Sequence, residues 1–250
     1  MRILLNGING HMGREIVRLA KEGYRGAEIA AGVDPAGRRE ENIPVSADFA
    51  GAETDVDCIV DFSHPSATEE LLAFALSRRL PLVIATTGQT EEQRQKILDA
   101  SREIPVFFAA NFSLGVALLI ELAKKAASVM ADAEIEIVEV HHDRKLDAPS
   151  GTALALAGAI RSVRPDSAVR TGRSGHGKRE KNEIGIHSLR MGNIVGIHEV
   201  LLSTPTQTIT LKHEAHDRAL FAEGALTAAD FLRGKPAGLY DLSSLLKSNR

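Results

Sequence analysis

The sequence predicts an α/β protein in two parts: a Rossmann-like, doubly wound parallel sheet, followed by an α+β domain built on an open mixed sheet. In the first part, apolar strand-like runs alternate with helical patterns, which is typical of a parallel sheet with helices on both faces. Three glycines, Gly7, Gly10 and Gly13, separate the first run from the first helix. In the second part, apolar and polar residues alternate with period two, which indicates half-exposed strands.

The composition is ordinary for a globular protein. The chain has 250 residues, of which 44% are hydrophobic and 25% charged, enough for two modest domains or one large one. The formal net charge of -3 gives no reason to expect a nucleic-acid partner. The single cysteine, Cys58, lies in an apolar run and fits a reducing compartment. We expect a cytoplasmic protein, because no run is apolar enough for a signal peptide or a membrane span.

The first strand is expected at Ile3–Leu5, and the glycines follow it directly as G-x-x-G-x-x-G. One glycine allows a tight turn, another lets a pyrophosphate approach the backbone, and the last lets the helix pack closely on the strand. The helix N-terminus then offers N–H groups to phosphates. The pattern predicts a dinucleotide-binding turn, with a glycine-rich turn that binds nothing as the alternative.

An acidic residue follows the second apolar run. Asp34 stands directly after Ile29–Val33 and 21 residues after Gly13, where a carboxylate can accept hydrogen bonds from an adenosine ribose. Arg38 and Arg39 come shortly afterwards. These two arginines are candidates for contact with a 2′-phosphate and equally for solvated surface charges.

The alternation continues through three further strands, Cys58–Phe62, Leu82–Ala85 and Pro105–Ala109, with helices at Glu69–Ser77 and Glu91–Ala100. Ligands of such sheets bind beyond the carboxyl ends of the strands. We therefore expect two strand-end segments to contact the cofactor, namely Ala85-Thr86-Thr87-Gly88 and Ala109-Ala110-Asn111-Phe112.

A polar segment, His141–Thr152, is the most informative part of the second half. A helix is expected over Leu114–Met130, and the strand that includes Glu134–Ile137 then leads to His141 and His142. Pro149 indicates a loop, after which Ser150 is a plausible N-cap for a helix over Gly151–Val163. The start of that helix can hold a carboxylate.

The residue types in this segment suit proton transfer. Histidine titrates near neutrality and lysine is a fixed proton donor, so His141 and Lys145 can act on a C–N or C–O bond beside a hydride donor. A metal site is disfavoured because no convincing third ligand is present and Lys145 would repel a cation. Surface histidines on a basic loop are the remaining alternative.

The rest of the second half is rich in strands. The glycine-rich basic segment Arg170–Lys181 reads as a mobile, mainly solvated loop. Ile184–Arg190 and Ile194–Leu202 are expected to pair with each other, and Thr208–Lys212 returns after a turn. A final helix over Arg218–Leu232 is expected to lead to the C-terminus. Three histidines in the strands are expected to be structural or interfacial: His187, His198 and His213.

Taken together, these motifs resemble the 4-hydroxy-tetrahydrodipicolinate reductase family, also called dihydrodipicolinate reductase. The similarity covers essentially the whole chain, in order. It is carried by Gly7–Arg14, Val60–Pro65, Thr86–Gly88, Ala110–Val116, His141–Ala153, Ile184–Arg190 and Gly192–His198.

The resemblance implies a reaction in lysine and diaminopimelate biosynthesis. A hydride passes from NADH or NADPH to a cyclic 2,6-dicarboxylate made from aspartate semialdehyde and pyruvate, water is lost, and tetrahydrodipicolinate forms. His141 would be the proton donor or acceptor and Lys145 a second proton donor. Substrate contacts would come from His142, Ser150, Gly151 and Thr152. The cofactor would contact Gly7, Ile8, Asn9, Gly10, His11, Met12, Gly13, Asp34, Ala85, Thr86, Thr87, Ala109, Ala110, Asn111 and Phe112.

The resemblance also implies an arrangement of domains. A dinucleotide-binding domain would span residues 1–112 and be completed by residues 217–250, and residues 113–216 would form a substrate-binding and oligomerisation domain. Members of the family form a homotetramer, mainly through the sheet of the second domain. Neither a nucleic acid nor a membrane is expected as a partner, and no metal is expected.

Two residues depart from the family's pattern. Members commonly have Arg where this chain has His11, and Gly where it has Ala85. The loss of a fixed positive charge at His11, with Asp34 followed by Pro35, predicts that NADH works at least as well as NADPH. Two other functions remain as alternatives: a related dehydrogenase that acts on a different amino-acid-derived substrate, and a nucleotide-sensing module without chemistry.

Overall fold

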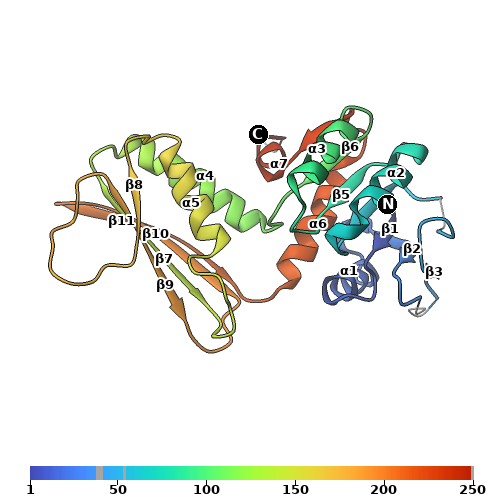
Figure 1. Cartoon of the computed structure of the whole chain (residues 1–250), viewed down its shortest axis with the longest axis horizontal. Coiled ribbons are helices and arrows are strands. Elements are labelled where there is room, and N and C mark those ends of the chain that lie inside the picture. Colours follow the sequence, from blue (N-terminus) through green and yellow to red (C-terminus); the bar gives the residue numbers. More distant parts are fainter. Residues whose placement is uncertain (38–41, 53–54, 249–250) are drawn as a thin grey trace. The chain divides into compact units, whose positions relative to one another are not determined.

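The computed structural model describes residues 1–37, 42–52 and 55–248. Its contacts divide the chain into two compact units. Unit 1 contains Met1–Ser113 and Ala219–Arg250, and unit 2 contains Leu114–Arg218. Figure 1 shows the elements of both units, and each unit is described by itself.

Unit 1 is built on a seven-stranded parallel sheet with the order β12-β6-β5-β4-β1-β2-β3. The strands are β1 (Arg2–Asn6), β2 (Glu28–Val33), β3 (Val45–Ser46), β4 (Cys58–Asp61), β5 (Leu82–Ile84), β6 (Pro105–Phe108) and β12 (Gly238–Tyr240). Strand order reverses at β1, which has β2 on one side and β4 on the other. Such a switch point is where doubly wound sheets bind their ligands.

Helices cover both faces of this sheet, because alternate residues of its buried strands point to opposite sides. On one face, α2 and α3 pack on strand residues such as Leu4, Ile59 and Leu82. On the other face, α1 contacts β2 and α6, and α6 contacts β4, β5 and β6. The helices of unit 1 are α1 (His11–Lys21), α2 (Thr68–Arg78), α3 (Glu91–Ala100), α6 (Ala219–Leu232) and α7 (Leu242–Ser248), with short 3₁₀ turns at Tyr24–Gly26 and Pro65–Ala67.

Unit 2 is a five-stranded mixed sheet with the order β11-β10-β7-β9-β8. β7 is parallel to β9 and antiparallel to β10, and α4 and α5 bury one face of the sheet through a second apolar core. The elements are α4 (Leu114–Val129), β7 (Glu134–His141), α5 (Gly151–Arg161), β8 (Ala168–Thr171), β9 (Glu183–Arg190), β10 (Gly196–Thr204) and β11 (Gln207–Ala215). The two sheets confirm the predicted fold class.

Two expectations about the elements were wrong. β9 and β10 do not pair with each other, because β7 lies between them. The helix α6 is not the last element, since β12 and α7 follow it and β12 joins the sheet beside β6. β12 has only three residues, too few to show a period of two.

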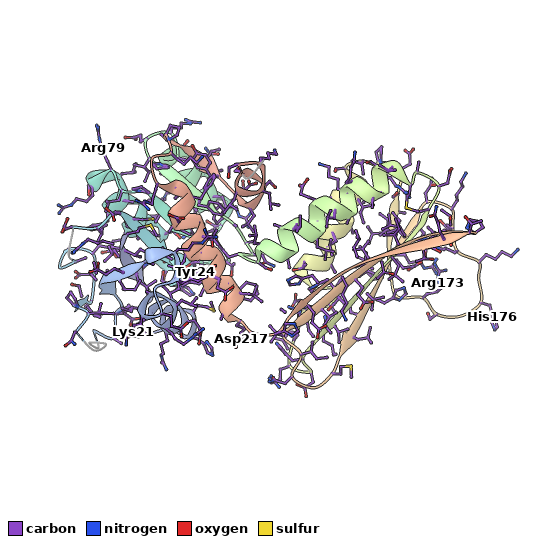
Figure 2. All side chains as sticks on the ribbon, turned by 180° about the vertical axis from the view of Figure 1, so that it is seen from behind. Lys21, Tyr24, Arg79, Arg173, His176 and Asp217 are labelled. Atoms are coloured by element: carbon purple, nitrogen blue, oxygen red, sulfur yellow. The ribbon has the colours of Figure 1, made fainter. Side chains whose placement is uncertain are left out.

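The basic segment Arg170–Lys181 is mostly exposed, as expected of a solvated loop, but it is anchored at both ends. Its first residues belong to β8, and Arg179 is largely buried, where it donates hydrogen bonds to Glu136 and to the Ile135 carbonyl. Arg173 pairs with the buried Glu183. Figure 2 shows Arg173 and His176 on the stretch that follows β8.

Among the described residues, no helix combines the length and the apolar character needed to span a membrane.

Candidate active site

The glycine turn of unit 1 packs so closely against backbone atoms that side chains would not fit there. Gly7 directly follows β1 with a φ of +81°, and a Cβ there would lie 2.5 Å from the Phe62 carbonyl oxygen. A Cβ on Gly13 would lie 2.3 Å from the Gly7 carbonyl oxygen, so only glycine lets α1 begin so close to the turn. Gly10 is the N-cap of α1 and provides no side-chain cap. The backbone of the turn is therefore open to a phosphate group.

Asp34 lies beside this turn. Its carboxylate accepts hydrogen bonds from the Asn9 N–H at 3.2 Å and from the Ala36 N–H at 3.0 Å. Asn9 Nδ2 is buried and has no hydrogen-bond partner among the described residues, as expected of a group that meets a ligand. The structure thus brings Asp34 to the glycine turn, while Arg38 and Arg39 lie outside the described residues.

A cavity lies at the carboxyl ends of β4 and β5. Ser63 and Thr86 join the two strand ends, since the Ser63 N–H donates to Thr86 Oγ1 at 2.8 Å. Beneath them, burial raises the pKa of Asp61 despite hydrogen bonds from Ser63, Thr86 and Asn6. The cavity is lined by Met12, Phe62, Ser63, His64, Pro65, Ala85, Thr86, Thr87, Gly88, Thr90 and Gln93.

Of the predicted cofactor residues, Met12, Ala85, Thr86 and Thr87 line this cavity, and the others, including His11 and Ala109–Phe112, lie outside its lining. His11 is the exposed first residue of α1. Ala109–Phe112 follows β6, where the Phe112 ring packs against Phe62 at 6.3 Å between ring centroids. A Cβ on Gly224 of α6 would lie 1.7 Å from the Phe112 carbonyl oxygen, so this glycine lets the helix pack directly against that segment.

In unit 2, the predicted residues gather where β7 ends and α5 begins. Ser150 caps α5, because its Oγ accepts a hydrogen bond from the Ala153 N–H at 3.2 Å. Gly151 and Thr152 form the first turn of that helix. His142 lies next to the end of β7, and its Nδ1 is buried without a hydrogen-bond partner among the described residues. A helix start and an unpartnered imidazole suit an anionic ligand.

His141 is the last residue of β7 and is buried. Its Nδ1 lies 2.5 Å from Glu139 Oε2, and Gly196 of β10 lies beside its ring, where a Cβ would be 3.1 Å from Nε2. Burial lowers the pKa of His141, while Glu139 works in the opposite direction and Lys145 adds to the lowering. His141 is therefore neutral near pH 7 and can accept or relay a proton.

Lys145 lies on the loop between β7 and α5. Its Nζ pairs with the Asp147 carboxylate at 2.8 Å, and its side chain is mostly buried. The loop is held to the neighbouring strand end by the His142 N–H, which donates to the Ile194 carbonyl at 2.8 Å. The four-residue spacing of His141 and Lys145 is thus not a helical one, as Pro149 indicated.

No group of three or more histidine, cysteine, aspartate or glutamate side chains among the described residues is arranged to hold a metal ion.

Comparison with known proteins decides the family. The model for the N-terminus of dihydrodipicolinate reductase matches residues 1–112, and the model for its C-terminus matches residues 115–246. The chain belongs to the dihydrodipicolinate reductase family. This confirms the resemblance seen in the sequence and makes the chain an oxidoreductase of that family.

Relatives of the same family are similar over the whole length. A 4-hydroxy-tetrahydrodipicolinate reductase of Clostridium tetani is 42% identical over 250 residues, which cover 99% of this chain and 98% of the relative. The reductase of Caldanaerobacter subterraneus subsp. tengcongensis is 44% identical over 249 residues, with the same coverage. The dipicolinate-bound dihydrodipicolinate reductase from Paenisporosarcina sp. TG-14 superposes with a TM-score of 0.79 at 26% identity, covering 96% of this chain and 97% of that one.

The reductase chain has polar groups beside these predicted residues that sequence reasoning missed. Glu139 contacts both His141 and Arg190, and the His198 ring lies 5.1 Å from that of His141. His198, expected to be structural or interfacial, also lies 3.1 Å from Ser150 Oγ. One signal could have found Glu139: it stands two residues before His141, so the period of two places both on one face. Nothing in the sequence pairs Arg190 or His198 with that face.

Proposed function

We propose that this chain reduces 4-hydroxy-tetrahydrodipicolinate to tetrahydrodipicolinate with NADH or NADPH, in lysine and diaminopimelate biosynthesis. In this reaction the substrate takes up a hydride and a proton and loses water. The observation that carries the proposal is the match of both halves of the chain to relatives of that name at above 40% identity.

The cofactor fits the glycine turn of unit 1. When bound, the nicotinamide cofactor supplies the hydride. The turn from Gly7 to Gly13, which leads into the uncapped N-terminus of α1, is assigned to the pyrophosphate, and Asp34 beside Asn9 can accept a hydrogen bond from a ribose hydroxyl. Ala85–Thr87 at the end of β5 and Ala109–Phe112 after β6 follow neighbouring parallel strands, so they are assigned to the rest of the cofactor.

The substrate is assigned to unit 2. The first turn of α5, at Gly151 and Thr152 after the Ser150 cap, is assigned to one carboxylate of the dicarboxylate. His142, with its unpartnered Nδ1, can donate to the ligand. The relative from Paenisporosarcina sp. TG-14 was solved with dipicolinate bound, which supports a small dicarboxylate.

Protons are assigned to His141 and Lys145. The lysine ammonium is a donor with a fixed charge, and its ion pair with Asp147 holds it on the loop that leads to α5. His141 is held through Nδ1, which leaves Nε2 as the nitrogen that gives or takes a proton. Lys145 supplies the proton that accompanies the hydride, and His141 accepts or relays a proton through Nε2 as the hydroxyl departs as water.

The assembly is proposed to be a homotetramer formed mainly through the sheet of unit 2. The face of this sheet opposite α4 and α5 carries partly exposed apolar residues, including Val138, Val140 and Leu189. A molar mass of four chains from light scattering is the expected result, and a monomer at micromolar concentration would contradict it.

The decisive test is an assay with the cyclic substrate, generated from pyruvate and aspartate semialdehyde in the cuvette. We expect NADH or NADPH to be oxidised only after that substrate has formed. A related dehydrogenase would instead leave the cofactor unoxidised with this substrate and oxidise it with another amino-acid-derived one. A nucleotide-sensing module would bind the cofactor and oxidise none.

A further inference from the structure

We propose that Glu139, held by Arg190, is the positioning residue of the unit 2 site: it orients His141 and ties the start of α5 and the Lys145 loop to the same point. The inference rests on the proposed function, because it takes His141 and Lys145 as the residues that exchange protons. Glu139 itself touches no reacting atom and acts through its neighbours.

Hydrogen bonds from four residues, His141, Arg190, Ser150 and Ser188, converge on the Glu139 carboxylate, whose side chain is fully buried. Oε2 accepts from His141 Nδ1 at 2.5 Å and from Arg190 at 2.9 Å, and Oε1 accepts from Arg190 at 2.8 Å and from the Ser150 N–H at 3.2 Å. A buried carboxylate is stable only when it is paired and hydrogen-bonded in this way. The Glu139 side chain therefore contacts both His141 and Ser150, the N-cap of α5.

Arg190 extends the connection to the lysine loop. The guanidinium that pairs with Glu139 also donates to the Asp147 carbonyl at 2.7 Å, and the Asp147 carboxylate holds Lys145. The predicted proton donors and the helix start thus share a single anchor. A shift of Glu139 would move all three, and small misplacements of catalytic groups are costly to turnover.

The Glu139 contact also selects the form of the imidazole. With Nδ1–H donated to the carboxylate, Nε2 of His141 is the nitrogen available for proton exchange. A Cβ on Gly196 would lie 3.1 Å from that Nε2, so the glycine leaves space around it. Burial alone would raise the pKa of Glu139, but the hydrogen bonds from Arg190, Ser188, His141 and Ser150 lower it to about 2. Glu139 therefore stays ionised and orients His141 without taking its proton.

The opposite face of the same strand offers a matched control. Glu136 of β7 accepts hydrogen bonds from Arg179 Nε at 3.0 Å and from His187 Nε2 at 2.9 Å. These are the same three residue types, glutamate, arginine and histidine, but they contact none of the predicted site residues among the described part of the chain. The Glu136 side chain is 30% exposed against 0% for Glu139, so its variant controls for the loss of a glutamate–arginine–histidine contact in this sheet and not for burial.

The experiment compares Glu139→Gln with Glu136→Gln in the full-length protein. We expect Glu139→Gln to lower kcat by at least about 10-fold, as losing the residue that orients a catalytic histidine does, with NADH affinity unchanged. Glu136→Gln should keep kcat within about threefold of the wild type.

The pH profile is a readout that a purely structural role would not move. The charged and titratable groups that face His141 are Glu139 on its own strand, Arg190 on β9, His198 on β10 and Lys145 on the loop. The carboxylate favours protonated His141, so its removal should move the acidic limb of kcat to lower pH. Glu136→Gln should leave the limb in place.

Nitrogen NMR of His141 tests the inference independently of activity. Wild-type protein should show the proton on Nδ1, and Glu139→Gln should show a mixture of tautomers. Should Glu139→Gln fail to fold, Arg190→Lys, which keeps the charge but loses the paired donors, should lower kcat with the Arg179→Lys control near the wild type. A folded Glu139→Gln with wild-type kcat, pH profile and tautomer would overturn the inference. A wild type without reductase activity but with the Nδ1 tautomer lost in Glu139→Gln would overturn the proposed function alone.

Discussion

The two units prepare their ligand sites by opposite means. In unit 1, the glycine turn requires residues without side chains, since a Cβ on Gly7 or Gly13 would collide with backbone atoms. In unit 2, the site consists of side chains that meet from β7, β9 and the start of α5, around the fully buried Glu139. The first kind of site depends on steric room, and the second depends on charge and protonation.

This difference tells us what each unit should tolerate. A backbone site ought to be sensitive to a single methyl group and insensitive to pH. A site built from His141, Glu139 and His198 ought to respond to acid, because each of these groups is held in one protonation state by its neighbours. The predictions below separate the two, from the largest expected effect to the smallest.

Removing either proton donor of unit 2 should affect turnover and leave unit 1 intact. We expect His141→Ala and Lys145→Ala each to lower kcat by roughly 10²-fold or more, the range of general acid–base residues. NADH binding, measured by fluorescence titration, should be unchanged because no predicted cofactor residue is altered. Turnover near the wild-type value in both variants would remove these residues from the mechanism.

A methyl group in the glycine turn should weaken NADH binding in unit 1 and leave the ligand site of unit 2 intact. In Gly13→Ala the added Cβ would meet the Gly7 carbonyl oxygen at 2.3 Å, so the backbone must shift. We expect the free energy of unfolding to fall by about 1–3 kcal/mol and NADH affinity to drop, while dipicolinate binding persists. The control is Gly158→Ala in α5, where a Cβ meets nothing within 4 Å and helix propensity predicts a gain of up to about 1 kcal/mol. Equal stability of the two variants would contradict the steric account.

Acid should destabilise unit 2 through His198. Burial lowers the pKa of His198 to about 4, so the unfolded chain binds a proton there at a pH where the folded chain does not. The stability that His198 contributes is present above pH 6.5 and is lost as the pH falls towards 4, which amounts to about 2 kcal/mol between pH 8 and pH 5. Asp61 of unit 1 has the opposite sign, because its raised pKa favours the folded state as the pH falls.

Urea unfolding at pH 8 and pH 5 checks this prediction. His198→Gln should remove most of the difference between the two pH values that is due to unit 2. The same pH dependence in this variant as in the wild type would assign it to other groups.

Removing the cap of α5 should give a smaller effect confined to unit 2. Ser150→Ala loses the hydrogen bond to the Ala153 N–H, and such caps contribute about 1 kcal/mol. Dipicolinate affinity should fall with it, and NADH affinity should stay constant. Ser162→Ala, at the other end of the same helix, serves as the control, and an equal loss of dipicolinate affinity there would argue against the helix start as the carboxylate site.

The smallest effect is expected for the choice of cofactor. His11 lies at the start of α1, where the sequence resemblance implies an Arg, so we expect the turn to have one fixed positive charge fewer for a 2′-phosphate. We expect NADH to serve at least as well as NADPH in kcat/KM. A preference for NADPH of more than about 100-fold, near 2.7 kcal/mol, would contradict this expectation.

The features that the sequence determined by itself are local ones. The β1–glycine turn–α1 unit, the helix at Glu91–Ala100 and the Ser150 cap were all predicted at or near their bounds. Each depends on residues a few positions apart: a period of two or 3.6, a capping hydroxyl, or a glycine where the chain turns tightly. The family resemblance also depends on such short motifs.

What only the tertiary structure decided is which distant segments lie side by side. The sequence predicted β9 beside β10, whereas β7 lies between them. Because β7 is central, Arg190 of β9 and His198 of β10 both lie beside the end of β7. β12, which lies near the C-terminal end of the sequence, pairs with β6 in the first sheet. No local pattern in the sequence indicated this pairing. Strand order and register are set by the packing of whole elements, and the period of a strand says which face a residue occupies but not which neighbour it meets.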